Sequence, residues 1–327
     1  MSLKKVQGAS EISRPKVLVS RCIGFEHCRW NGDIIASPYI EKLKNHVDFI
    51  TVCPESDIGL GVPRKPVRLF VAGSEIKMLQ HETGFDVTDK MNSFSEIFFE
   101  KLNPVEGILF KERSPSCGMS NVKIYSGATE GASITRKGCG LFAARWKKAF
   151  PSLPSASEGH LYNYALREHF YTQIFTLARF RTIRTVPAIK NLVDFHARHK
   201  LILMSYNQTL MRQMGRLVAN HENRETDEVF DCYFELLCSA LGRQPRTMSP
   251  INVLMHALGY FSEKVSGGEK KFFLDLLEQY RQKKTPQSTC NAVIKSWIVR
   301  FDENYLATQF FFNPYPESLI ELSDSGK

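Results

Sequence analysis

The chain has 327 residues, enough for two domains of ordinary size, and its 43% hydrophobic and 11% aromatic content is typical of a packed globular protein. A charged fraction of 24% argues against a disordered chain, and no apolar run is long enough to span a bilayer. The first ten residues lack the apolar stretch of a secretory signal peptide, so we expect a cytoplasmic protein whose eight cysteines are core residues, metal ligands or catalytic thiols rather than disulfides.

Short β-rich runs alternate with helical patterns in the first half of the chain, which predicts βαβ units around a parallel sheet. Ser37 and Ser93 are the expected N-caps of two helices, because a serine hydroxyl can accept a hydrogen bond from a free amide of the first turn. The expected elements are, in chain order, the strand Lys16–Cys22, the helix Ser37–His46, the strand Asp48–Cys53, the helix Ser93–Leu102, the strand Gly107–Glu112, the loop Ser126–Gly140 and the helix Leu141–Ala149.

The segment Pro151–Ser157, rich in Pro and Ser, is the expected linker, and it divides the chain into predicted domains 1–156 and 157–327. After it, amphipathic helical patterns follow one another, and little of the sequence is typical of strands. The predicted fold class is therefore an α/β N-terminal domain with a mostly parallel sheet, followed by an all-α C-terminal domain. The helices expected in the second domain are Asn163–Ile183, Ala188–Ser205, Gln208–His221, Asp227–Leu241, Pro250–Phe261, Glu269–Lys284 and Thr289–Tyr305.

The formal net charge of +9 is concentrated in one part of the chain. Residues 167–216 carry nine Lys or Arg against two Asp or Glu, whereas residues 217–327 carry 12 basic and 15 acidic side chains. Such a basic segment suits a polyanion such as tRNA, and an ordinary solvated helix surface explains it equally well. The side chains that we expect to contact RNA phosphates are Arg198, Lys200, Arg212 and Arg216.

Three cysteines occupy equivalent places in the βαβ pattern. Cys22 closes the first predicted strand, Cys53 closes the second, and Cys117 lies in the loop after the third. Because ligands bind outside the carboxyl ends of the strands in an open parallel sheet, we expect the three thiols to converge. Three thiolates suit zinc or an iron–sulfur cluster, although the fourth ligand and the paired spacing of a structural zinc site are missing. Three unrelated buried cysteines are the alternative.

Polar residues beside these cysteines favour a reaction centre. Glu55 follows Cys53 by two residues, and Ser114 and Ser116 directly precede Cys117. An acid, two hydroxyls and three thiols at one edge of a sheet are more typical of catalysis than of a core. Gly118 is expected to let the backbone approach a bulky cluster.

Other candidates have simpler interpretations. Cys28 is a nearby thiol that we do not expect to ligate, and Cys139 is interpreted as a small loop residue. His196 and His199 have the spacing of metal ligands on a helix, but no acidic partner follows them, so we expect no metal there. Arg64 either lines the substrate side of the sheet or pairs with a surface carboxylate. The cysteines interpreted as core residues of helices are Cys232, Cys238 and Cys290.

The segments VSRCIGFEHCRWNG, VCPESDIGLGVPR and KERSPSCG resemble the thiouracil desulfurase family, over roughly residues 15–150. The segments LVDFHARHKLILMSYNQ and NVLMHALGYF and the closing PYP resemble the helical domain that is often fused behind such desulfurases. Together they are similar to two-domain desulfidases that act on 4-thiouridine in tRNA. Cys28 is a departure, because no family cysteine is expected at that position.

The resemblance implies a 4Fe–4S cluster held by Cys22, Cys53 and Cys117, with one open iron that acts as a Lewis acid on the substrate's sulfur. It favours Glu55 as the general base that activates water, and Ser114 or Ser116 as a hydrogen-bond partner of the pyrimidine or the water. A structural role for Glu55 is the alternative. The expected activity is non-redox removal of sulfur from 4-thiouridine in tRNA. The alternatives are desulfuration of free thiopyrimidines, and an RNA-binding or stress-related protein whose cluster is structural.

Overall fold

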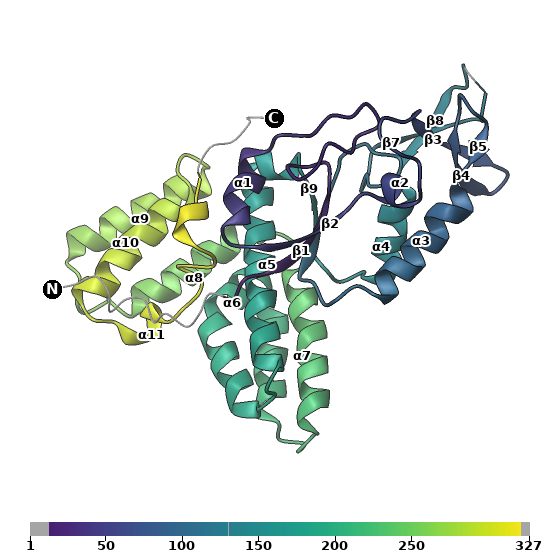
Figure 1. Cartoon of the computed structure of the whole chain (residues 1–327). Helices are drawn as coiled ribbons and strands as arrows, with labels where there is room; N and C mark the ends of the chain where they lie inside the picture. Colours follow the sequence, from purple (N-terminus) through teal and green to yellow (C-terminus); the bar gives the residue numbers. More distant parts are fainter. Residues whose placement is uncertain (1–12, 130, 322–327) are drawn as a thin grey trace. The chain divides into compact units, whose positions relative to one another are not determined.

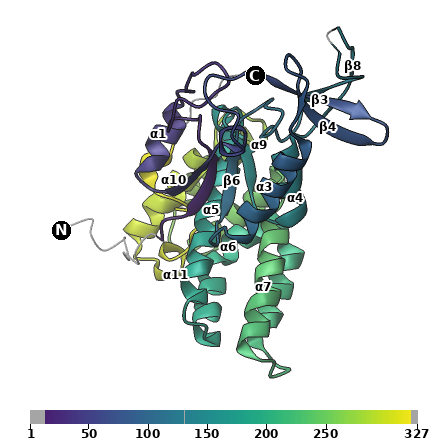
Figure 2. The ribbon, with the colours of Figure 1, turned by 45° about the vertical axis from the view of Figure 1, so that its right-hand side comes forward.

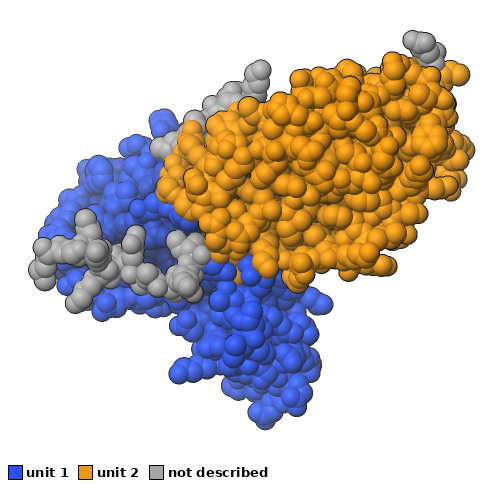
Figure 3. All heavy atoms as spheres, viewed as in Figure 1, with its two compact units in different colours: residues 1–13, 179–317 blue, residues 14–178, 318–327 orange. Residues whose placement is uncertain are grey.

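A computed structural model describes residues 13–129 and 131–321 of the chain (Figure 1). The chain forms two compact units, which Figure 3 shows in different colours. The α/β unit comprises Arg14–Ala178 with Ser318–Lys327, and the helical unit comprises Arg179–Glu317 with Met1–Ser13. The predicted fold class, α/β followed by all-α, is confirmed.

The sheet at the centre of the α/β unit is parallel throughout. Its strand order is β2 (Asp48–Val52), β1 (Lys16–Ser20), β6 (Gly107–Phe110) and β9 (Ser155–Ser157). The first three are the strands predicted from sequence, but each ends one or two residues earlier than expected. The predicted metal-binding cysteines therefore lie beyond the strands, in the loops at the carboxyl edge of the sheet.

Two of the three helices predicted for this unit begin where the sequence indicates. Helix α1 (Pro38–Lys44) is capped by Ser37, whose Oγ accepts the Ile40 amide at 3.4 Å. Helix α4 spans Leu141–Ala149, as predicted.

The prediction for helix α3 (Thr88–Glu100) is wrong at its N-terminus, because Ser93 lies inside the helix rather than at its cap. The chain already turns into the helix at Thr88, whose amide donates to Asp86 Oδ1 at 2.9 Å. Helices α3 and α4 lie side by side (Figure 1).

A second, mixed sheet was not predicted. Its order is β5 (Phe85–Asp86), β4 (Glu75–Gln80), β3 (Val67–Ala72), β7 (Val122–Tyr125) and β8 (Ile134–Gly138). The pairs β3–β4 and β7–β8 are antiparallel, and β3–β7 is parallel. Strand β8 falls in a segment expected to be a loop. Four of its five residues are exposed, so it lacks the apolar alternation by which a half-buried strand is recognised in sequence.

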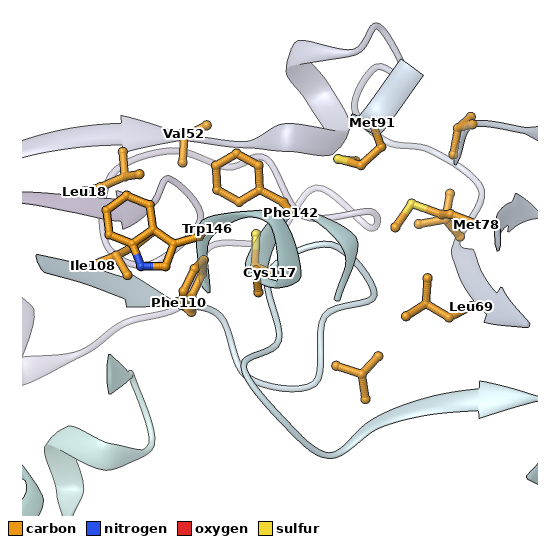
Figure 4. Packing of buried hydrophobic residues seen from close by; sticks show 14 of the residues in the cluster. Leu18, Val52, Leu69, Met78, Met91, Ile108, Phe110, Cys117, Phe142 and Trp146 are labelled. Carbon is orange, nitrogen blue, oxygen red and sulfur yellow. The ribbon is translucent and has the colours of Figure 1, made fainter. Parts of the chain in front are cut away.

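The hydrophobic core of the α/β unit connects the parallel sheet with helix α4. Leu18, Ile108 and Phe110 from the sheet pack with Phe142 and Trp146 from α4 (Figure 4). Cys117 belongs to the same cluster, so the loop that carries it is anchored on the core.

The helical unit follows the predicted helices closely. The segments predicted as Ala188–Ser205 and Gln208–His221 are joined as α6, but Asn207 is non-helical, with φ −155° and ψ 97°. Asn207 Oδ1 accepts the Leu210 amide at 3.0 Å, so it caps the second part of α6, as two separate helices would require. Helices α6 and α7 lie side by side (Figure 2). The helices of the second half are α5 (Tyr164–Arg184), α6 (Ile189–Ala219), α7 (Thr226–Leu241), α8 (Met248–Gly259), α9 (Gly267–Arg281), α10 (Gln287–Arg300) and α11 (Asn304–Ala307).

The segment expected to be a linker contributes to the sheet. Its last three residues form β9, which pairs with β6, and the two compact units divide between Ala178 and Arg179, inside α5. The boundary at residues 156 and 157, as the limit of independently folding domains, stays a prediction. Within the described ranges, no helix is long and apolar enough to cross a membrane.

Candidate active site

A cavity of about 400 Å³ opens at the carboxyl edge of the parallel sheet, and the structure brings the three predicted cysteines to its wall. Cys22 lies two residues beyond β1, Cys53 directly follows β2, and Cys117 lies in the loop after β6. Their residues are only 9%, 8% and 5% exposed. Segments about thirty and sixty residues apart in sequence thus contribute thiols to one enclosed space.

The surroundings of the Cys53 and Cys117 thiols favour the protonated form in the absence of a metal. Burial raises the pKa of the Cys117 thiol to about 12. The pKa of Cys53 is raised by a hydrogen bond with the Cys28 thiol and by burial. A buried thiol of this kind becomes a thiolate only when a cation replaces its proton, which is the behaviour of metal ligands.

Glu55 is held in a chain of hydrogen bonds on the wall of the same cavity. Its Oε2 accepts from Arg64 Nε at 2.9 Å and from Arg64 Nη2 at 2.7 Å, and its Oε1 accepts from the Ser116 hydroxyl. The two side chains of the ion pair are 10% and 4% exposed. Of the two roles considered for Arg64, the structure supports the first, because Arg64 lines the cavity at the edge of the sheet. Its carboxylate partner, Glu55, is buried rather than at the surface.

The two serines of the SPSC segment have different tasks. Ser114 Oγ accepts the Cys117 amide at 3.1 Å and the Ser116 amide at 3.3 Å, so it shapes the turn that presents Cys117. Ser114 Oγ is also 3.0 Å from Ser116 Oγ, and Ser116 donates to Glu55. A proton taken up at this end of the cavity can therefore pass along hydroxyl groups to the carboxylate.

Comparison with known proteins agrees with this geometry. The pattern of the 2-thiouracil desulfurase family matches residues 17–158, and the C-terminal region, residues 200–316, matches a family described as a protein of unknown function, DUF1722. The chain is 33% identical over 140 residues to the uncharacterized protein YbbK of Bacillus subtilis (strain 168), covering 41% of this chain and 90% of YbbK. The chain belongs to the 2-thiouracil desulfurase family.

Two further relatives cover similar lengths. The uncharacterized protein YbgA of Escherichia coli (strain K12) is 28% identical over 136 residues, which is 41% of this chain and 80% of YbgA. Among solved structures, the [4Fe-4S]-dependent thiouracil desulfidase TudS has 27% sequence identity and a TM-score of 0.34. The match covers 45% of this chain and 93% of TudS.

Gly118 in the desulfurase region has a packing role within its own turn. A Cβ at this position would lie 2.3 Å from Val122 Cγ2 and 2.8 Å from the Ser114 carbonyl oxygen. The glycine is therefore required by close packing within the turn that carries Cys117, and its expected role beside a cluster stays a prediction.

Cys28 is the cavity residue that sequence reasoning underestimated. It is 1% exposed, and its carbonyl oxygen accepts from Arg64 Nη1 at 2.9 Å. Its thiol lies within hydrogen-bonding reach of the thiols of Cys22 and Cys53, and the bond with Cys22 is the main reason that its pKa rises to about 11. The sequence did indicate that Cys28 lies near the cavity, because Cys28 and Cys22 belong to the same segment after β1.

The remaining sequence candidates lie outside the cavity lining. Cys139 Sγ contacts the Met119 carbonyl oxygen at 2.7 Å and Lys147 Nζ at 3.3 Å. His196 Nδ1 is 3.1 Å from the Tyr233 hydroxyl, and His199 Nδ1 donates to the Phe195 carbonyl at 2.7 Å. Of the other cysteines, Cys238 and Cys290 are buried in the helical unit, and Cys232 is half-buried.

In the part of the chain that the structure describes, no group of three or more His, Cys, Asp or Glu side chains could hold a single metal ion. A 4Fe–4S cluster has a different requirement, because each cysteine ligand binds a different iron.

The predicted RNA-binding residues all lie on α6. Lys200, Arg212 and Arg216 are exposed, whereas Arg198 is half-buried, with its guanidinium 4.7 Å from the centre of the Phe310 ring. Other basic residues of this segment have structural contacts: Arg179 also stacks on Phe310, Arg184 pairs with Asp231 at 2.8 Å, and Arg167 is fully buried. Part of the charge excess is therefore used inside the fold, and RNA binding by the exposed part stays a prediction.

Proposed function

We propose that the chain is a cytoplasmic iron–sulfur desulfidase that removes sulfur from a thiolated pyrimidine, with 4-thiouridine in tRNA as its substrate. The observation that carries the proposal is the arrangement of the cavity wall. The Cys22, Cys53 and Cys117 thiols share that wall with a buried carboxylate whose two oxygens are held by a guanidinium and a hydroxyl. Membership of the 2-thiouracil desulfurase family supports the choice of substrate chemistry.

The donor set fits a 4Fe–4S cluster. The three thiols would bind one iron each and leave the fourth iron open to a soft sulfur ligand, and buried thiols are the ligands that such clusters use. When bound, the cluster supplies a Lewis acid for the thiocarbonyl sulfur.

The protein groups handle the water that replaces the sulfur. Arg64 binds one carboxylate oxygen of Glu55, and the other oxygen accepts the hydrogen bond from the Ser116 hydroxyl. The water that attacks the ring carbon gives up its proton to Glu55, directly or through the hydroxyls of Ser116 and Ser114. The overall change is thiocarbonyl plus water to carbonyl plus hydrogen sulfide, and no electrons are exchanged.

The tRNA part of the proposal rests on the helical unit. Lys200, Arg212 and Arg216 are exposed on α6 and carry no acidic partner in the described ranges, so they are available to phosphates. A base inside folded RNA must be turned out of its stack before its sulfur can enter a buried cavity, and phosphate contacts made by α6 would hold the strand for this step.

A free thiopyrimidine is the second candidate substrate. It is favoured by the location of the cavity, all of whose lining residues belong to the α/β unit. A small base could therefore be bound and converted without any contribution from α6.

One experiment distinguishes these substrates. Protein purified without oxygen is incubated with tRNA that contains 4-thiouridine and, in parallel, with 4-thiouracil, and the products are measured by mass spectrometry. The proposal predicts conversion of 4-thiouridine to uridine in tRNA, with sulfide released. Conversion of 4-thiouracil alone would establish the second candidate, and conversion of neither would refute the desulfidase proposal.

A further inference from the structure

Four thiols, rather than three, line the candidate active site. Cys28 is the most deeply buried of them at 1% exposure, and its thiol is within hydrogen-bonding reach of both Cys22 and Cys53. The Cys53 thiol also donates to the Cys28 carbonyl oxygen at 3.7 Å. The three-cysteine ligand set assigns no task to Cys28.

Cys28 is buried in the core, but it also lies in the wall of the cavity beside other thiols. A buried cysteine without a function normally packs among apolar side chains. Cys117 does pack in this way and belongs to the hydrophobic cluster of the α/β unit, but Cys28 is not a member of that cluster. Polar groups near Cys28 include the thiols of Cys22 and Cys53, and the guanidinium of Arg64 contacts its carbonyl oxygen.

The backbone of Cys28 is fixed on both sides of its α-carbon. Its amide donates to the Glu26 carbonyl at 2.9 Å, and its carbonyl accepts from Arg64 Nη1 at 2.9 Å. The same guanidinium holds Glu55. With the backbone held, rotation about χ1 is the motion by which the thiol would change position.

We propose that Cys28 is an exchangeable fourth ligand, which occupies the open iron of the cluster in the substrate-free enzyme and gives way to the sulfur of the substrate. This inference rests on the proposed function, because it needs the cluster that Cys22, Cys53 and Cys117 would hold. Thiolate is a preferred ligand of iron in such clusters, and a thiol beside two of the other ligands has a high local concentration at the fourth iron.

The exchange balances without a co-reactant. One iron–sulfur bond to Cys28 breaks, one bond to the substrate sulfur forms, and the released thiolate takes one proton from water. The oxidation state of the iron does not change. Covering the open iron between turnovers protects it from oxidative loss, because an iron without a protein ligand is the one most easily lost from a 4Fe–4S cluster.

The test compares the parent with Cys28→Ala, Cys28→Ser and Cys139→Ala, all purified without oxygen. Cys139→Ala is the matched control, because it removes a half-buried thiol that is absent from the cavity lining. Mössbauer spectroscopy of protein enriched in iron-57 reports whether one iron differs from the other three. Electron paramagnetic resonance then follows the formation of a 3Fe–4S cluster after mild oxidation.

We expect four similar irons in the parent and in Cys139→Ala, and one distinct iron in both Cys28 variants. The 3Fe–4S signal should form in Cys28→Ala several-fold faster than in the parent, and addition of 4-thiouracil to the parent should make one iron distinct. If Cys28→Ala loses the whole cluster while Cys28→Ser keeps it, a ligand role is again supported, because serine retains a ligating oxygen.

A parent protein that already shows one distinct iron, and that oxidises at the same rate as Cys28→Ala, would overturn the inference while leaving the desulfidase proposal intact. A parent that binds no cluster when supplied with iron and sulfide would instead refute the proposed function itself.

Discussion

Replacement of Glu55 by glutamine separates catalysis from structure more sharply than any other change at the site. The amide keeps the size of the side chain and one oxygen acceptor, but it cannot take a proton from water. Loss of a general base typically lowers turnover by roughly a hundredfold or more. The charge opposite Arg64 is lost as well. A hydrogen bond to a charged group contributes about 1.5–3 kcal/mol, so the free energy of unfolding should fall by about that amount.

Glu158→Gln is the matched control for this variant. Glu158 is also a buried carboxylate, with an 11% exposed side chain paired with Lys111, but it is not among the residues that line the cavity. We expect both variants to lose stability to a similar degree in a denaturant titration. Turnover of 4-thiouracil, measured per cluster, should fall only in Glu55→Gln. If Glu55→Gln with a full cluster turns over as fast as Glu158→Gln, another group activates the water.

Three further predictions concern the ligands, the RNA surface and a buried histidine. Replacing Cys22, Cys53 or Cys117 by serine should lower the iron and sulfide content of protein purified without oxygen. The control Cys139→Ser should not lower it. A cysteine whose serine variant keeps the full iron content and activity is not a ligand. Replacing Arg198, Lys200, Arg212 and Arg216 together by Glu should raise the Kd for tRNA across a salt series, because phosphate contacts release counterions on binding. Turnover of 4-thiouracil should stay unchanged. Parent-like tRNA binding at low salt would refute this prediction. Burial lowers the pKa of His196 from 6.5 to about 4, so protonation of this side chain favours unfolding. The contribution of His196 to the free energy of unfolding of the helical unit should be complete above pH 6.5. It should fall by about 3 kcal/mol as the pH drops through 4. A His196→Gln variant with the same loss over this range would show that another group titrates.

The convergence of the three thiols could be predicted from the sequence, because it follows from one general property of parallel sheets. Strands β1, β2 and β6 lie side by side, so residues just beyond their carboxyl ends meet at one edge. The pairing of Arg64 with Glu55 could not be derived in the same way. It depends on how the irregular segment between α2 (Pro54–Asp57) and β3 folds back over the cavity, and such a segment has no periodicity to indicate its path.

Errors in the predicted elements have equally specific causes. Ser93 is a good capping residue by type, but a helix begins where its first turn is stabilised. Asp86 accepts the amide of Thr88, so α3 begins at Thr88, five residues before Ser93. Strand β9 was hidden because Pro and Ser indicate a linker, whereas an edge strand of a parallel sheet can be as short as Ser155–Ser157. Trp146 Nε1 donates to Ser155 Oγ at 3.1 Å, a long-range contact that helps to hold this short strand.

The central claim is that the cavity replaces sulfur by the oxygen of water without a change in oxidation state. It is tested most directly by a single turnover on 4-thiouracil in oxygen-18-labelled water, without any electron donor, with the product analysed by mass spectrometry. Our account predicts one labelled oxygen in each uracil formed and one sulfide released for each uracil. Unlabelled product, or turnover that requires a reductant, would contradict it.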